Sequence, residues 1–144
     1  MAHEDVVRIA RQVHSTHWRL TGDEGTGDRL AAQITREWQS QVLNSFPDRC
    51  KPEHPVGNLR ERIDLVDVID GVAYEMKVSP NNDHFEFYRD VFKVIVARDN
   101  GSPYLKAFVF LCPASAAKRF SAGLRQAVLS DGARLGLSLH VEGP

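Results

Sequence analysis

Two runs of apolar, β-branched residues separated by a turn signal stand out in the middle of the chain. The runs, Ile63–Ile69 and Val72–Val78, flank Asp70-Gly71, a dipeptide that favours a two-residue hairpin turn with positive φ. The pattern therefore predicts an antiparallel hairpin in which the numbers of paired residues add up to 141. Because side chains alternate along a strand, this register also predicts which residues share a face.

One face of the predicted hairpin is almost entirely apolar, and we expect it to be core; it carries Ile63, Leu65, Asp67, Ile69, Val72, Tyr74, Met76 and Val78. The other face is apolar near the turn and charged at the open end, and it carries Asp64, Val66, Val68, Ala73, Glu75 and Lys77. In the predicted register Asp64 lies opposite Lys77 and diagonally adjacent to Glu75. A one-residue slip would expose the apolar set, so burial fixes the faces.

The remaining periodicities predict helices over residues 4–18, 28–46, 82–98 and 114–130, a loop over 47–60, a buried strand over 104–111 and a half-buried strand over 135–141. The third helix has an apolar stripe that we expect to face the core, made of Phe85, Tyr88, Val91, Phe92 and Ile95. This order predicts an α/β fold whose central mixed sheet joins the hairpin to parallel crossover strands, with helices on both faces.

Composition favours one domain. The chain has 144 residues and is 42% hydrophobic, which is enough for a single core. We expect residues 1–27 to form an N-terminal helix and loop and residues 28–144 to form the core. The longest apolar run is too short for a bilayer, and Cys50 and Cys112 lack metal-ligand spacing. These features predict a cytoplasmic protein without a membrane partner.

The sequence of an Asp, a hairpin and then Glu-x-Lys resembles the PD-(D/E)XK nuclease superfamily, which includes many restriction endonucleases and Holliday-junction resolvases. The resemblance covers roughly residues 28–141. It implies a restriction endonuclease-like core, with Asp64 and Glu75 as the two motif acids and Lys77 as the motif lysine; Ile63 replaces the family's proline. Many members add a Glu from a preceding helix, and Glu37 fits that position. The family usually also has a strand before the first acid, where this sequence predicts a loop.

The resemblance implies a magnesium-dependent endonuclease that hydrolyses phosphodiester bonds in restriction, repair or defence, with DNA as the expected substrate and RNA as the alternative. Asp64 and Glu75 would hold Mg²⁺ together with Glu37 and the Met76 carbonyl, and Mn²⁺ would substitute because both ions accept hard oxygen ligands. Lys77 would orient or activate the attacking water. Phosphodiester hydrolysis needs such a site because charge grows on the phosphate and on the leaving oxygen.

Two structural alternatives stay open. The charged face can be a solvated surface on which Asp64 and Lys77 form a cross-strand ion pair, although burial on both faces of the sheet would make these charges costly without a role. In a different register Asp67 would be the metal ligand; in the predicted one it is a structural acid paired with a helix.

On function, the alternatives are a non-catalytic nucleic-acid-binding or assembly module with the same fold, and a nuclease acting on RNA.

Charge limits how the protein can bind nucleic acid. The net charge is −1, from 18 basic and 19 acidic residues, so any contact with phosphates must be local. The candidate contacts are Arg49, Lys51, Arg60, Arg62, Arg89 and Lys93. Cutting both strands of a duplex also needs paired sites, so we expect a homodimer or a larger complex.

Overall fold

The computed structural model describes residues 2–21, 28–78, 83–123, 132 and 134–143. The elements follow one another as α1 (Ala2–Thr21), α2 (Asp28–Ser45), β1 (Cys50–Pro55), β2 (Arg62–Asp67), β3 (Val72–Met76), α3 (Asp83–Asp99), β4 (Ala107–Leu111), α4 (Ala114–Gly123) and β5 (Ser138–Glu142). Every predicted helix and strand is present. The predicted loop at 21–27 and the C-terminal half of the fourth helix lie mostly outside the described residues.

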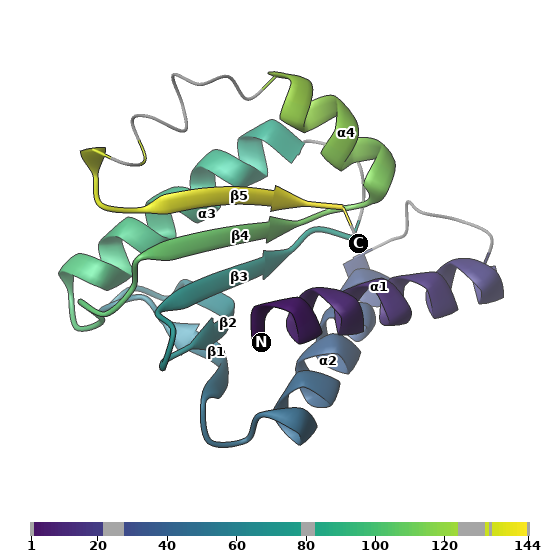
Figure 1. Ribbon diagram of the computed structural model, residues 1–144, viewed down its shortest axis with the longest axis horizontal. Helices are drawn as coiled ribbons and strands as arrows, with labels where there is room; N and C mark the ends of the chain where they lie inside the picture. The colour runs from purple at the N-terminus through teal and green to yellow at the C-terminus, as the bar shows by residue number, and fades with distance from the viewer. Residues whose placement is uncertain (1, 22–27, 79–82, 124–131, 133, 144) are drawn as a thin grey trace.

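The predicted mixed sheet is confirmed. Its five strands lie in the order β1-β2-β3-β4-β5; β1, β2 and β3 are antiparallel neighbours, and β3, β4 and β5 are parallel. Figure 1 shows α1 and α2 on one side of the sheet and α3 on the other. Side chains of β4 alternate between the two cores, with Phe108 and Phe110 on the α3 side and Val109 and Leu111 on the α1 side. None of the helices in the described ranges is long and apolar enough to cross a membrane.

Strand β1 corrects the prediction of a loop over residues 47–60. It pairs with β2 from Cys50 to Pro55 although it contains two prolines. Prolines are tolerated here because β1 is an edge strand, whose outward N–H groups need no partner in the sheet. Glu53, between the two prolines, has a φ of 50°, a value uncommon for residues other than glycine. Because β1 contains two prolines and no β-branched residue, it lacks the pattern from which a strand is predicted.

The hairpin is present, but its predicted register is wrong by two residues. Asp67 pairs with Val72 and Leu65 pairs with Tyr74, so paired numbers add up to 139 and the turn contains four residues, 68–71. Gly71 has the expected positive φ of 68°. A shift of two residues preserves the alternation of faces. It changes the partners, however: continuing the register places Asp64 opposite Glu75 rather than opposite Lys77. Ile69, predicted to be core, lies in the turn and is 68% exposed.

Asp67 determines the longer turn. Its buried carboxylate accepts hydrogen bonds from the backbone amides of Ile69 and Asp70 at 3.0 and 3.1 Å. It also accepts two hydrogen bonds from the Arg49 guanidinium, at 3.2 and 2.8 Å. Asp67 is thus the structural acid that the sequence suggested, and it lies on the face away from Asp64. Its partner belongs to the turn between α2 and β1 rather than to a helix.

The predicted core stripe of α3 is confirmed only in part. Val91 and Ile95 are partly buried and pack against the core, whereas Phe85, Tyr88 and Phe92 are exposed. Among the described side chains of α3, the buried ones are Phe87, Asp90, Lys93, Val94 and Ala97. The helix is therefore rotated from its predicted orientation, because it buries two charged residues and leaves three aromatic rings in solvent.

Asp67→Ala should destabilise the protein by about 2–4 kcal/mol, because it removes a buried acceptor of four hydrogen bonds and leaves partly buried donors without it. For a chain of this size the midpoint of thermal unfolding should fall by roughly 5–15 °C. Asp70→Ala is the control, since Asp70 contacts the same Arg49 at 2.8 Å but its side chain is 46% exposed. Equal losses in the two variants would show that Asp67 does not organise the turn.

Candidate active site

A cavity of about 350 Å³ opens at the end of the hairpin away from the turn. It lies between β1, β2, β3, α2 and α3, and its lining includes Glu53, Asp64, Glu75, Met76, Lys77, Glu86, Arg89, Asp90 and Lys93, with Ala31, Ala32, Thr35 and Arg36 from α2. The structure thus places Asp64, Glu75 and Lys77 around one cavity. Four charged residues of the lining were not predicted as site residues: Arg36, Glu53, Glu86 and Asp90.

Asp64 and Glu75 are side by side as direct cross-strand neighbours. Asp64 is half-buried and Glu75 is buried. The Asp64 carboxylate accepts a hydrogen bond from the Met76 backbone amide at 2.9 Å. On the adjacent helix, Gln39 donates to the Asp64 carbonyl at 2.6 Å and to the Glu53 carboxylate at 3.3 Å. These contacts fix the acid on β2 against the acid on β3.

Lys93 of α3 brings a positive charge to these acids. Its ammonium lies 2.6 Å from Glu75 Oε1 and 3.2 Å from Asp90 Oδ1, and it donates a hydrogen bond to the Arg62 carbonyl at 2.9 Å. Lys93 is only 8% exposed, so its charge is engaged by these acids rather than presented to solvent, and its contact with a phosphate stays a prediction. A buried ammonium is stable here because two carboxylates and a carbonyl surround it.

Lys77 and Arg89 lie closer to solvent and share one acid. Glu86 is 3.5 Å from the Lys77 ammonium and 2.9 Å from the Arg89 guanidinium. The Lys77 side chain is 14% exposed, whereas that of Arg89 is 50% exposed. Lys77 comes directly after β3 and two positions after Glu75. It lines the cavity, where Glu86 of α3 is its ion-pair partner.

Burial is the leading cause that raises the pKa values of the three acids nearest Lys93, although a hydrogen bond with Glu75 opposes this effect at Asp64. Burial raises the pKa of Glu75 well above its usual range, and the charges of Asp64 and Asp90 add to the effect. Burial also raises the pKa of Asp64 and Asp90, against the stabilising effect of Lys93. Burial alone would lower the pKa of Lys93, but Glu75 and Asp90 outweigh it and raise that pKa. Perturbed acids in a cavity are typical of functional sites.

A divalent metal ion such as Mg²⁺ requires several hard oxygen ligands. In the described part of the chain, no three His, Cys, Asp or Glu side chains are grouped as a ready metal site. The oxygens of Asp64, Glu75 and Asp90 are nevertheless ligands of the type that Mg²⁺ prefers. Glu75 Oε1 and Asp90 Oδ1 are buried, and the cation that they face is the Lys93 ammonium, at 2.6 and 3.2 Å. The residue types therefore fit a divalent cation, whereas their arrangement in this structure holds the ammonium.

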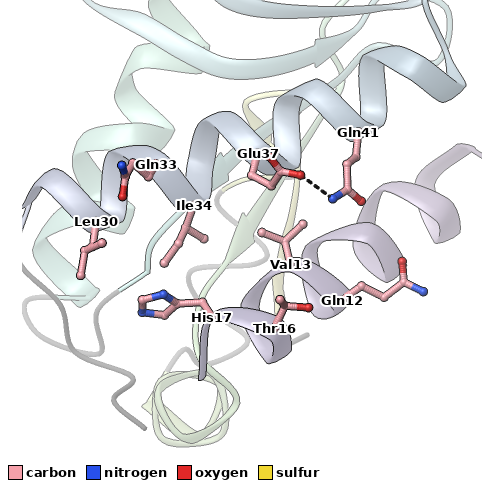
Figure 2. Close-up of a pocket in the computed structure, with 9 residues that line it drawn as sticks. All are labelled: Gln12, Val13, Thr16, His17, Leu30, Gln33, Ile34, Glu37 and Gln41. Carbon is pink, nitrogen blue, oxygen red and sulfur yellow. Dashed lines mark hydrogen bonds between the residues drawn. The ribbon is translucent and has the colours of Figure 1, made fainter. Parts of the chain in front are cut away.

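Glu37 does not approach this site, which corrects its predicted role as a fourth acid. Figure 2 shows Glu37 in a different cavity, between α1 and α2, where its carboxylate accepts a hydrogen bond from Gln41 at 2.8 Å. That cavity has a volume of about 650 Å³, and its lining also includes Gln12, Val13, His17, Leu30 and Ile34. We call the cavity lined by Asp64 and Glu75 the acidic cavity. The residues of α2 that line it lie on another side of the helix.

The predicted nucleic-acid contacts are distributed over several surfaces. Arg49 is held by Asp67 and Asp70 on the opposite face of the sheet, so it does not form the predicted phosphate track. Lys51, Arg60 and Arg62 are exposed, but they do not line the cavity. Arg89 is the predicted contact that is both exposed and at the cavity.

The chain matches no protein-family model, no curated protein and no solved structure.

Glu75→Gln should raise the stability of the metal-free protein, and the gain over wild type should grow as pH is raised from about 5 to about 8. A carboxyl whose folded pKa is raised contributes stability below its unfolded pKa, and this contribution is lost as pH rises through the folded pKa. The gain should therefore be larger at about pH 8 than at about pH 5. Thermal melts in chelator measure it, with Glu4→Gln, an exposed acid of α1, as the control. A difference that is constant across pH would contradict the raised pKa.

Proposed function

We propose that this protein is a magnesium-dependent nuclease with a restriction endonuclease-like core. The observation that carries the proposal is that Asp64 and Glu75 are cross-strand neighbours at one cavity, which Lys77 also lines. These are the three residue types of the PD-(D/E)XK motif, in the order and on the strands that the motif requires. The raised pKa of Glu75 adds support, because burial and, to a lesser extent, the charges of Asp64 and Asp90 disfavour its ionised form, which a bound cation would stabilise.

The topology supports the same proposal. The family usually has a strand before the one that carries the first acid, and β1 is such a strand. The helix-preceded hairpin and the following parallel β3-α3-β4 unit also agree with the family core. DNA is the proposed substrate, and the proposal includes action as a homodimer or within a larger complex.

Each proposed role follows from where the side chain lies. Asp64 and Glu75 would hold Mg²⁺, with the Met76 carbonyl as a further candidate ligand, and Mn²⁺ would substitute. The ion, when bound, would lower the pKa of a bound water and neutralise charge that grows on the phosphate. Lys77, free to leave Glu86, would orient the attacking water or contact a phosphate oxygen. Arg89, exposed at the rim, would bind a neighbouring phosphate.

One observation favours the non-catalytic alternative. The Lys93 ammonium lies between Glu75 and Asp90, at 2.6 and 3.2 Å, and so provides a cation without any metal. A non-catalytic binding module would therefore need no metal ion to offset the negative charges of these acids in the folded state. Cleavage assays separate the two functions.

Asp64→Asn, Glu75→Gln and Lys77→Ala should each reduce magnesium-dependent cleavage at least a hundredfold, because each removes a ligand or a cation at the reacting phosphate. The substrates are plasmid, linear, branched and single-stranded DNA together with RNA, each incubated with and without Mg²⁺. Glu37→Gln is the matched control and should keep wild-type activity, since Glu37 lies in the other cavity. Cleavage by Asp64→Asn at the wild-type rate would overturn the proposal.

A further inference from the structure

Three aromatic side chains form a row on the solvent side of α3. Phe85, Tyr88 and Phe92 are 72%, 52% and 68% exposed, and we call them the aromatic stripe. Their spacing of three and four residues places them on one side of the helix. Large exposed apolar groups that cluster in this way mark binding surfaces more often than isolated ones do.

The stripe is continuous with the acidic cavity. Glu86, Arg89, Asp90 and Lys93 of the same helix line that cavity. At about 100° per residue, Arg89 falls between the stripe and Lys93 around the helix axis. A nucleic-acid strand with a phosphate at Asp64 and Glu75 would therefore pass Arg89 and extend its next nucleotides over the stripe.

The charges of the chain indicate how such a strand would be held. With a net charge of −1, electrostatic attraction to phosphates is weak. Two of the predicted phosphate contacts are also engaged elsewhere, Arg49 with Asp67 and Lys93 with Glu75. Stacking of bases on aromatic rings provides affinity that needs no net positive charge and tolerates any base sequence.

The spacing of the rings suits a single strand. Along the helix axis, Tyr88 lies about 4.5 Å beyond Phe85, and Phe92 lies about 6 Å beyond Tyr88. These steps are somewhat longer than the rise of roughly 3.4 Å per nucleotide along one strand of a duplex, so they match an extended strand with its bases unstacked from each other. A duplex keeps its bases inside and offers the rings only its backbone.

We propose that the aromatic stripe binds unpaired bases, so that the substrate of the acidic cavity is a single-stranded or locally unpaired nucleic acid. This inference rests on the proposed nuclease function, because it places the strand by the phosphate in the cavity.

Binding of a fluorescent oligonucleotide tests the proposal by anisotropy. The probes are a 20-nucleotide oligothymidine and a duplex of equal length, measured in the Asp64→Asn background so that neither is cut. Adding Phe85→Ala and Phe92→Ala should weaken binding of the oligothymidine at least tenfold and leave duplex binding within about twofold. Tyr104→Ala is the matched control, because Tyr104 is an aromatic residue outside α3 that is 38% exposed and packs against His54. Thermal melts establish that each variant is folded.

The outcomes separate the stripe from the nuclease. Unchanged oligothymidine binding in the double variant would overturn the role of the stripe. A dimer that becomes a monomer in the double variant, by light scattering, would overturn it too and show that the stripe joins two copies of the chain. For cleavage, the two substitutions are made in the protein that keeps Asp64. Equal cleavage rates on duplex and single strands, unchanged by these substitutions, would support the nuclease function and overturn only the role of the stripe. Loss of oligothymidine binding in the double variant, with no cleavage by wild type, would uphold the stripe and overturn the nuclease.

Discussion

The Lys93 ammonium and the buried acids around it form the interaction on which the site depends. Glu75 and Asp90 are buried with Lys93 between them, and Asp64 adjoins Glu75. Without a cation, three acids this close would repel one another, and burying their charges would oppose packing of α3 on the sheet. Lys93 also bonds the Arg62 carbonyl, which ties α3 to the first residue of β2. The ammonium therefore stabilises the folded arrangement and occupies space that a bound metal ion would compete for.

Helix α3 combines the three properties that the proposed function needs. Its buried side packs Phe87 and Val94 into the core, its polar side carries Asp90 and Lys93 to the cavity, and its outer side carries the aromatic stripe. The sheet provides the complementary half, because the hairpin places Asp64 and Glu75 on the face that α3 covers. One helix thus links the fold, the chemistry and the surface proposed to bind the strand.

Much of the fold and part of the site can be predicted from the sequence. The order of helices, the mixed sheet and the placement of Asp64, Glu75 and Lys77 at one cavity follow from alternation, which survives a register error of two residues. The predicted register was wrong because the Asp67 side chain caps a longer turn. The periodicity of apolar residues gives no information about such a side-chain contact. Strand β1 was not predicted, because its two prolines are uncommon within strands. The buried side of α3 was predicted only in part, because hydrophobicity alone would bury Phe85 and Phe92 and expose Asp90 and Lys93. In the structure Asp90 and Lys93 are buried instead, because Lys93 pairs with Asp90 and with Glu75 of the distant strand β3.

We propose that Asp64 and Glu75 form a divalent cation site. Crystals of the protein soaked in Mn²⁺ and measured at the manganese absorption edge test this proposal, because anomalous scattering locates the ion without any assay of activity. We expect an anomalous peak at metal–oxygen bonding distance from both carboxylates, with Lys93 displaced from Glu75; the peak should be absent in Asp64→Asn. A wild-type crystal that binds no manganese there, with the ammonium still between Glu75 and Asp90, would contradict it.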